Sequence, residues 1–344
     1  MLEKRMWGEK PYNSLDYYLK ETYGRKLYKI SLDAGLTCPN RDGTLGTNGC
    51  IFCSEGGSGD FSASSKLSIT DQIVEAKERV CQKLPAGQLP TKLKLNTHNI
   101  DGQRPDDQGP VNQPANPKKE PYAGQGSFIA YFQAFTNTYG DISYLRKIYR
   151  EALYHDDIAI LSIATRPDCL GDEVLELLAE CARIKPLWVE LGLQTCHEET
   201  AELIHRGYTL PVFEKAVKDL NAIGAKVIVH MILGLPGENN EMILSSMDYL
   251  KSQPIHGIKL QLLHVLKNTA LSLMPYRAME LEEYIDLLLA CVERLPQDMV
   301  IHRLTGDGPK KLLLAPLWSG NKKLVLNTIT KEMKTRDTWQ GKAL

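Results

Sequence analysis

Residues 158–193 read IAILSIATRPDCLGDEVLELLAECARIKPLWVELGL, and this stretch decides the fold. The runs Ile158–Ala164 and Leu187–Leu193 are almost continuously apolar, which is typical of parallel strands covered on both faces. The segment between them, Asp172–Ile184, carries an apolar stripe at helical spacing, formed by Val174, Leu177, Leu178 and Cys181. The stretch therefore predicts a strand, a helix and a second strand, the unit from which parallel sheets are built.

The same alternation extends over most of the chain. Pro211 in a first helical turn and Gly224 after a last one delimit another helix, and Glu280–Leu295 predicts a further one. The other predicted strands are Lys26–Leu32, Ser127–Phe135, Lys226–Leu233, Gly257–His264 and Met299–Leu304. Six or seven such units in a row predict an α/β fold with a parallel sheet curled into a partial or complete TIM-like barrel. A site is then expected at the carboxyl ends of the strands.

Composition excludes several classes of protein. The 344 residues are 43% hydrophobic, too apolar for a disordered chain, and eight cysteines are too few for a secreted disulfide scaffold. With 41 basic and 42 acidic side chains, the net charge of −1 does not indicate a nucleic-acid binder. Neither a signal peptide at the charged N-terminus nor a membrane-spanning apolar run is evident. We expect a soluble, cytoplasmic protein that does not associate with membranes.

Residues 85–125 interrupt the pattern with seven prolines and many Gln, Asn, Lys and Asp side chains. Such a composition predicts a flexible insertion. It divides the chain into a lead-in with the first strand, a cysteine-bearing loop and the first helix (1–84), the insertion (85–125), the rest of the barrel (126–298) and a C-terminal extension (299–344).

Three cysteines follow the first predicted strand directly, in the arrangement C-x11-C-x2-C. Cys38, Cys50 and Cys53 are separated by turn-forming residues, so the segment is expected to be a folded-back loop. Thiolates hold iron–sulfur clusters, and three of them would leave one iron of a [4Fe–4S] cluster open to another ligand. Phe52 precedes the third cysteine.

Other interpretations of these cysteines remain open at this stage. A structural zinc site requires a fourth ligand, for which Cys81 or His98 is the nearest candidate. A redox pair of the Cys-x-x-Cys type normally opens a helix, which the flanking glycines disfavour. Three unrelated cysteines gathered in one glycine-rich loop would be unusual. The cluster accounts best for the pattern.

Further strings accompany the cysteine loop, and together they resemble one family. They are YKISLDAGLTCPNRDGTLGTNGCIFC (28–53), YFQAFTNTY (131–139), TRPDC (165–169), ELGLQT (190–195), HRGYT (205–209), GLPGE (234–238), LTGDGP (304–309) and PLW (316–318). With an aromatic residue before the third cysteine, the chain resembles the radical S-adenosylmethionine (SAM) superfamily, and within it the YhcC/YtqA-type branch. That branch is related to the Elongator catalytic subunit and to the oxygen-independent coproporphyrinogen oxidases.

The resemblance implies a partial (β/α)6 TIM-like barrel with a small C-terminal extension. It also implies an enzyme whose [4Fe–4S] cluster, held by Cys38, Cys50 and Cys53, cleaves SAM to a 5′-deoxyadenosyl radical. This chemistry consumes one electron, so a low-potential donor such as a flavodoxin or a ferredoxin is an implied partner. The tight turn in Gly234–Gly237 is expected near the adenine.

The resemblance further implies a set of SAM contacts at the strand ends. They are Phe52, Thr136, Asn137, Arg166, Glu190, Gln194, Arg206 and His230. Cys169 is a weak candidate for a catalytic thiol, while His264 and Lys267 are candidates for facing the substrate. Each has a plain structural alternative, such as a strand end, a surface ion pair or a satisfied core histidine.

Charge is unevenly distributed along the chain. Residues 301–344 hold nine basic and three acidic side chains, a balance of +6, so the remainder carries −7. A basic C-terminal region beside an open barrel suits a phosphate-rich partner, although a solvated basic tail is the simpler explanation. Kinship with the Elongator subunit points to tRNA, and specifically to the wobble uridine. The resemblance to the YtqA-type branch implies conversion of a carboxymethylaminomethyl group on that base to an aminomethyl group. The alternatives are a radical SAM enzyme acting on a small metabolite or a peptide, and a non-catalytic metal-binding protein.

Overall fold

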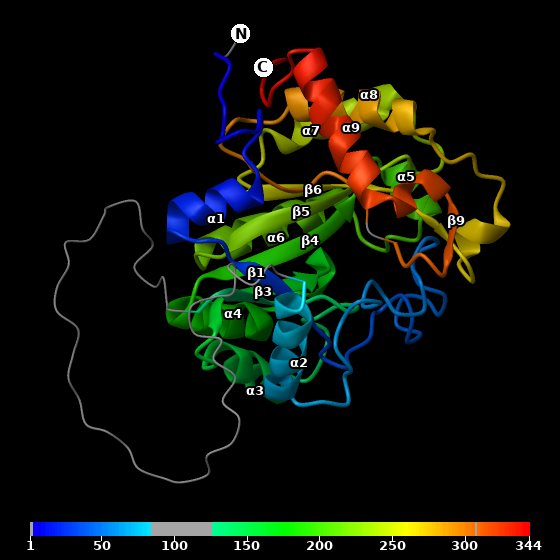
Figure 1. The fold of residues 1–344 in the computed structure, drawn as a ribbon. Coiled ribbons are helices and arrows are strands. Elements are labelled where there is room, and N and C mark those ends of the chain that lie inside the picture. The colour runs from blue at the N-terminus through cyan, green and yellow to red at the C-terminus, as the bar shows by residue number, and fades with distance from the viewer. Residues whose placement is uncertain (1–2, 84–125, 307) are drawn as a thin grey trace.

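Seven parallel strands lie side by side in the order β1-β2-β3-β4-β5-β6-β8 and form one curled sheet, an open half-barrel (Figure 1). The computed structural model describes residues 3–83, 126–306 and 308–344. The strands of the sheet are β1 (Tyr28–Leu32), β2 (Phe128–Phe132), β3 (Ile158–Thr165), β4 (Leu187–Gln194), β5 (Lys226–Leu233), β6 (Gly257–Leu262) and β8 (Val300–Arg303). A separate antiparallel pair is formed by β7 (Val265–Leu266) and β9 (Leu313–Ala315).

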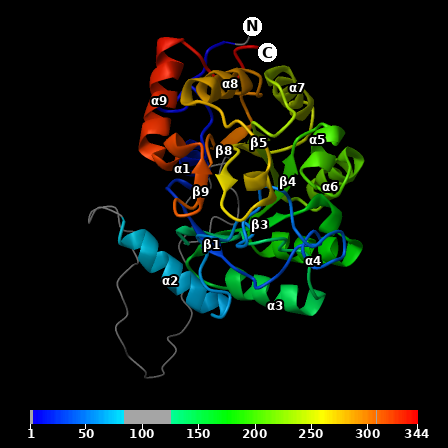
Figure 2. The same cartoon turned by 90° about the vertical axis from the view of Figure 1, so that its right-hand side faces the viewer.

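Helices surround the outer face of the sheet, as the view along the barrel shows (Figure 2). Their apolar stripes and the outward side chains of the strands form the main core. The helices are α1 (Leu15–Tyr23), α2 (Ile69–Cys81), α3 (Ile142–Leu153), α4 (Asp172–Ile184), α5 (Glu198–Leu203), α6 (Leu210–Ala222), α7 (Asn240–Leu250), α8 (Leu281–Glu293) and α9 (Lys322–Thr335). Three short 3-10 turns are η1 (Pro167–Cys169), η2 (Ala270–Leu273) and η3 (Leu317–Gly320).

Helix α1 packs at the amino ends of the strands, where the half-barrel would otherwise be open. Leu19 and Tyr23 of α1 are buried in a cluster with Ile160, Trp188 and Ile228, which lie near the starts of β3, β4 and β5. The helix begins after Ser14, whose hydroxyl accepts a hydrogen bond from the Tyr17 amide, a normal N-cap. With this end filled, the carboxyl ends of the strands are left for a site.

All seven predicted strands of the main sheet are confirmed, with shorter ends in places. Strand β2 ends at Phe132 rather than at Phe135, because Phe135 has a left-handed backbone conformation with φ of 57° and the chain turns there. Strand β6 ends at Leu262, and the chain then enters the β7–β9 pair. The prediction of a flexible insertion at 85–125 falls on residues outside the described ranges.

The C-terminal region is folded onto the barrel and meets the N-terminal segment. Helix α9 packs beside α8, with Val325, Ile329 and Met333 buried in the main core. The side chain of Gln340, fully buried, accepts a hydrogen bond from the Asn13 amide at 2.8 Å and donates one to the Met299 carbonyl at 2.8 Å. Across residues 3–83, 126–306 and 308–344, we find no helix long and apolar enough to cross a bilayer.

Candidate active site

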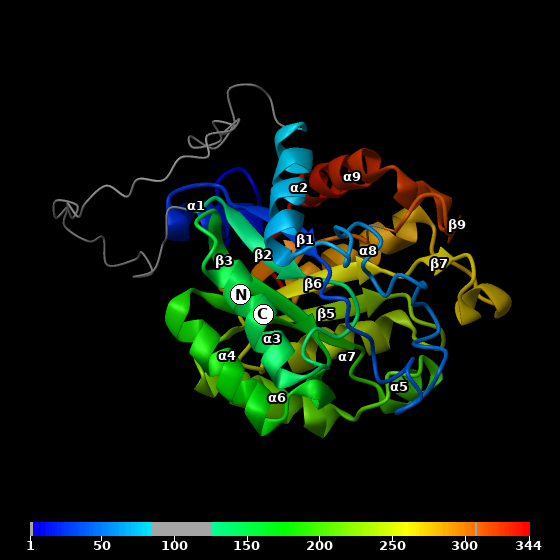
Figure 3. The ribbon, with the colours of Figure 1, turned by 90° about the horizontal axis from the view of Figure 1, so that it is seen from below.

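The cysteine-bearing loop, residues 33–68, reaches from β1 across the carboxyl ends of the strands to a position beside α5 (Figure 3). Ile51, which lies between Cys50 and Cys53, is buried in a small apolar core with Ile204 and Leu271. Its amide donates to the Ile204 carbonyl at 3.3 Å, and its carbonyl accepts from the Leu271 amide at 2.8 Å. The middle of the loop, around Ile51, is thus attached to the opposite side of the half-barrel.

Polar side chains hold the rest of the loop in place. Arg41 donates to the carbonyl oxygens of Cys53, at 3.1 Å, and Ser54, at 2.6 Å. Gln133, directly after β2, donates to the Ser58 carbonyl at 2.7 Å. Gly57 has a φ of 53°, and a β-carbon there would lie 2.2 Å from the Phe135 ring, so only glycine allows this close approach.

Cys38, Cys50 and Cys53 line one cavity of about 800 Å³ at the strand ends. All three are free thiols. Burial raises the pKa of Cys50 to about 12 and also raises that of Cys53. Because an iron–sulfur cluster is held by thiolates, these sites acquire their charge on metal binding and release protons as they do so.

Three guanidinium groups surround this end of the cavity. Arg41, Arg166 and Arg206 line it together with the cysteines, and the Asn40 amide lies 3.5 Å from the Cys50 sulfur, to which it donates a hydrogen bond. Hydrogen-bond donors and positive charge around the thiolates favour an anionic metal cluster. From the sequence alone, Asn40 and Arg41 were recognisable only as turn-forming residues.

The structure disfavours the other interpretations of the cysteines. In the described part of the chain, no three His, Cys, Asp or Glu side chains are grouped so as to hold a metal ion. Cluster thiolates each bind a different iron and need not converge on one point. Cys81 ends α2 beside Lys77 and Asp157, and His98 lies outside the described residues. No helix starts at Cys50 or Cys53, as a redox pair would require.

Gln194 is the residue best placed to meet a ligand beside the cysteines. It ends β4 with a φ of 69°, and its side-chain oxygen is buried without a hydrogen-bond partner in the structure. Thr136 lines the same cavity, whereas Asn137 lies behind it and donates to the carbonyl oxygens of Phe132 and Ala164. An unpaired buried acceptor fits a ligand that brings a donor, such as a ribose hydroxyl or an amino group.

Arg166 and Arg206 are both largely occupied by this chain's own groups. Arg166 forms a bidentate pair with Asp168, with distances of 2.9 and 2.6 Å. Arg206 donates to the backbone carbonyls of Thr195 and Tyr208 and to the Glu198 carboxylate. The Tyr208 ring lies between the two guanidinium groups, whose central carbons are 5.1 and 4.8 Å from its centre. Tyr208 thus packs against both guanidinium groups, which are held at the cavity by their hydrogen bonds.

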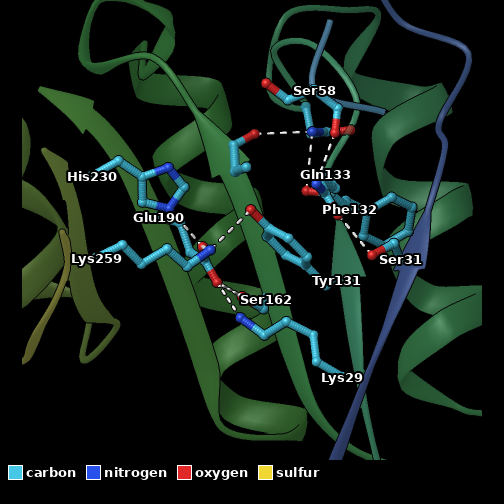
Figure 4. A network of polar contacts seen from close by, with 12 residues as sticks. Lys29, Ser31, Ser58, Tyr131, Phe132, Gln133, Ser162, Glu190, His230 and Lys259 are labelled. Atoms are coloured by element: carbon cyan, nitrogen blue, oxygen red, sulfur yellow. Dashed lines mark hydrogen bonds and ion pairs between the residues drawn. The ribbon is translucent and has the colours of Figure 1, made fainter. Parts of the chain in front are cut away.

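Glu190 occupies the centre of a buried polar network inside the half-barrel (Figure 4). Its carboxylate accepts hydrogen bonds from Lys29 at 2.5 Å, from Ser162 at 2.8 Å, and from Lys259. The fourth bond comes from His230 at 2.7 Å. A carboxylate has about four acceptor positions, so the chain itself fills all of them. The predicted SAM contact of Glu190 would therefore need one of these bonds to open.

The pKa values of the groups in this network are set by their burial and by their interactions with the single carboxylate of Glu190. Desolvation opposes the charge of Glu190, but Lys259 and Lys29 outweigh it and hold its pKa well below the usual range. Desolvation and the neighbouring Lys259 lower the pKa of His230 to about 4, so the ring is neutral. Desolvation also lowers the pKa of Lys259, to about 7. Lys29 and Lys259 were not among the predicted site residues, although a lysine within an apolar strand is itself a signal.

A second cavity of about 950 Å³ extends from the first toward β6 and β8. His264 lines it, together with Lys259 and Arg303. The two cavities share the lining residues Phe52, Cys53, Ser58, Tyr131, Gln133, Gln194 and His230, so they form one continuous space. A cofactor and a substrate would lie end to end in such a continuous space at the carboxyl ends of the strands.

Cys169 lies outside that space. It ends η1 and lines a separate hollow with Pro39 and Thr44. Burial raises its pKa to about 12, so the thiol is protonated and a weak nucleophile. Its amide donates to the carbonyl of Arg166 at 3.2 Å, but Cys169 does not line the cavity that holds the other predicted site residues.

Comparison with known proteins decides the family. The sequence profile of the radical SAM superfamily matches residues 117–250, and that of the Radical_SAM C-terminal domain matches residues 255–335. The chain is 38% identical to YtqA of Bacillus subtilis over 97% of its own length and 93% of that protein. The chain belongs to the radical SAM superfamily. It is thus an enzyme that uses a [4Fe–4S] cluster and SAM.

Two further comparisons support this radical SAM assignment. Protein YhcC of Escherichia coli is 31% identical over 88% of this chain and 86% of its own. An Elp3 structure from Methanocaldococcus infernus, with an N-terminal deletion, superposes with a TM-score of 0.53 at 20% identity. It covers 62% of this chain and 55% of the Elp3 chain, a likeness that concerns the fold.

Proposed function

We propose that this radical SAM enzyme acts on the side chain of the tRNA wobble uridine and converts a carboxymethylaminomethyl group to an aminomethyl group. Kinship carries this proposal. Elongator complex protein 3 of Schizosaccharomyces pombe is 26% identical over 91% of this chain, and the tRNA uridine(34) acetyltransferase of Methanocaldococcus jannaschii is 28% identical over 45%. The chain spans 60% and 29% of those proteins, respectively, so the shared part is the radical SAM portion.

The surface near the cavity is compatible with an RNA partner. Lys310 and Lys311 are exposed and follow Pro309, which lines the cavity. Lys322, Lys323, Lys331 and Lys334 are exposed along α9. Basic side chains that flank a site bind phosphates without regard to sequence, which leaves recognition of the base to the cavity.

We assign the cluster to Cys38, Cys50 and Cys53, because these free thiols share a cavity ringed by arginines. Bound there, the cluster and SAM would supply a carbon radical that removes a hydrogen atom from the methylene group beside the substrate carboxylate. Return of one electron to the cluster and loss of a proton would leave an imine. Hydrolysis of its C=N bond by water would release the two carboxymethyl carbons as an oxo acid and leave the aminomethyl group. A low-potential donor such as a flavodoxin or a ferredoxin would deliver the electron.

The chain's own side chains would bind and orient SAM beside these cysteines. Gln194 offers its unpaired side-chain oxygen as an acceptor, and the neutral His230, whose Nε2 donates to Glu190, keeps Nδ1 as a further acceptor. Thr136, Arg166, Arg206 and Phe52 complete the wall of the cavity. We do not assign SAM contacts to Asn137 or Glu190, because the first lies behind the cavity wall and the second is saturated by internal donors.

Two experiments test the substrate. Mass spectrometry of tRNA nucleosides from a strain lacking the gene should show carboxymethylaminomethyl uridine accumulating at the expense of its aminomethyl product. Purified protein with a reconstituted cluster, supplied with SAM and dithionite, should form the aminomethyl nucleoside on that tRNA, and a Cys53→Ala variant should not.

An unchanged wobble-uridine profile would exclude this substrate. If the reconstituted protein still cleaved SAM, a small-metabolite or peptide substrate would then be the better explanation. Failure to cleave SAM under any condition would favour a metal-binding role without catalysis.

A further inference from the structure

Three nitrogen-bearing side chains stand in a row on one wall of the cavity. His230 of β5 pairs in register with Lys259 of β6, and Lys259 pairs with Arg303 of β8. Register partners in neighbouring parallel strands point to the same face of a sheet. All three side chains line the larger part of the cavity. His230 also lines the part with Cys38 and Cys50, whereas Lys259 and Arg303 do not.

The members of this row differ in their partners. His230 donates to Glu190, and Lys259 pairs with Glu190 and lies 3.3 Å from the Tyr131 hydroxyl. Arg303 is half-buried, yet among the described residues its guanidinium group has no hydrogen-bond or ion-pair partner.

No carboxylate in the described part of the wall compensates this guanidinium group. Glu190 is shared by Lys29 and Lys259, and Asp60, across the cavity, instead accepts a hydrogen bond from the Ser54 hydroxyl at 2.9 Å. A half-buried cation without a counter-ion is unfavourable, unless a ligand supplies the negative charge.

We propose that Arg303 is the binding residue for a carboxylate on the substrate, held at the β6–β8 end of the cavity. The fork of N–H donors in a guanidinium group matches the two oxygens of a carboxylate. The inference rests on the proposed function, in which the uridine side chain carries a carboxymethyl group. Anchored at Arg303, that group would direct the rest of the side chain along the continuous cavity toward Cys53.

Binding measurements without turnover test this role. Two labelled anticodon stem-loop RNAs, one with carboxymethylaminomethyl uridine and one with aminomethyl uridine, have the same phosphates and differ in the carboxymethyl group. Fluorescence anisotropy is recorded anaerobically on the cluster-loaded protein with SAM and without reductant. We expect the wild type to bind the carboxylate-bearing RNA at least about tenfold more tightly, the range of a hydrogen-bonded charged pair.

Variants at Arg303 should remove that preference selectively. Arg303→Met should bind both RNAs equally, with unchanged affinity for the aminomethyl RNA, while Arg303→Lys should keep part of the preference. Arg277→Met is the matched control, because Arg277 is exposed and paired with Glu283. Its preference should equal that of the wild type.

The outcomes separate the two proposals. A wild type that binds neither RNA contradicts the proposed function, and this inference falls with it. A wild type that binds both equally overturns the carboxylate site while leaving tRNA as partner. If the wild type discriminates and Arg303→Met does so equally well, the proposed function stands and Arg303 is not the binding residue.

Discussion

The side-chain amide of Asn40 donates hydrogen bonds to the sulfur of Cys50, at 3.5 Å, and to the carbonyl of His205, at 2.6 Å. It thus links a proposed cluster ligand to the turn after α5. Hydrogen bonds to ligating sulfurs stabilise the reduced, more negative form of a cluster. One residue therefore couples the position of the loop to the electronic properties of the metal site.

We expect Asn40→Ala to lower the reduction potential of the cluster and to weaken iron retention by about 10–100-fold, as loss of an outer hydrogen bond does in metal sites. An anaerobic redox titration followed by electron paramagnetic resonance measures the potential. Asn48→Ala is the control, since Asn48 is exposed in the same loop. An unchanged potential in Asn40→Ala would show that this hydrogen bond has no electronic role.

Replacing Glu190 by glutamine should destabilise the protein by about 3–5 kcal/mol, because the buried Lys259 and the half-buried Lys29 lose their shared, fully buried counter-ion. Urea unfolding of the cluster-free protein measures this change. A cycle with Lys259→Met and the double variant isolates the pair, and we expect Lys259→Met to offset part of the loss in Glu190→Gln. A loss below about 0.5 kcal/mol, the range of ordinary surface substitutions, would contradict the buried network.

The stability should fall as the pH drops from about 6.5 toward 4. Desolvation, aided by Lys226, lowers the pKa of His256 to about 3, while an unfolded histidine titrates near 6.5. As the pH falls, the unfolded chain therefore binds the proton first. Between about pH 6.5 and 4, a histidine of this kind lowers the free energy of unfolding by about 1.4 kcal/mol per pH unit. His256→Phe keeps an aromatic ring against Tyr18 and should make the pH dependence of unfolding shallower by about that amount. Equal slopes for both proteins would refute the assignment.

Neutralising Lys310 and Lys311 together should weaken tRNA binding and reduce the slope of log K against log salt by about two, one for each phosphate that a lysine no longer neutralises. The affinity is measured by anisotropy over a series of salt concentrations. Lys147→Gln with Lys218→Gln provides a control of equal charge, since both lysines are exposed on the outer helices α3 and α6. If both double variants lose the same affinity, binding is a matter of overall charge and not of this surface.

The barrel strands were predictable because a strand that is buried on both faces appears in the sequence as a short, nearly continuous apolar run. The β7–β9 pair was not predictable. Strands of two and three residues carry little sequence pattern, and these two strands are separated by almost fifty residues in the sequence. Helix α1 was also not identified. Its hydrophobic residues meet the inner face of the sheet only once the barrel has curled.

The cysteine motif predicted one end of the candidate site, because three thiols at short spacing have few other uses. The opposite wall could not be derived in this way. Lys259 and Arg303 are 44 positions apart and become neighbours only through the register of β6 and β8. The network around Glu190 was hidden for the same reason, because its four partners come from four other strands.

The packing of α9 fixes more than the end of the chain. Val325, Ile329 and Met333 are buried in the core, and beyond them Gln340 is bonded to Asn13 and Met299, so the helix is attached to the barrel along one face and at its end. This packing sets the position of its exposed lysines relative to the cavity. A polyanion that contacts the lysines and the cavity together must be long enough to reach from one to the other. The protein would therefore select its partner by size as well as by charge.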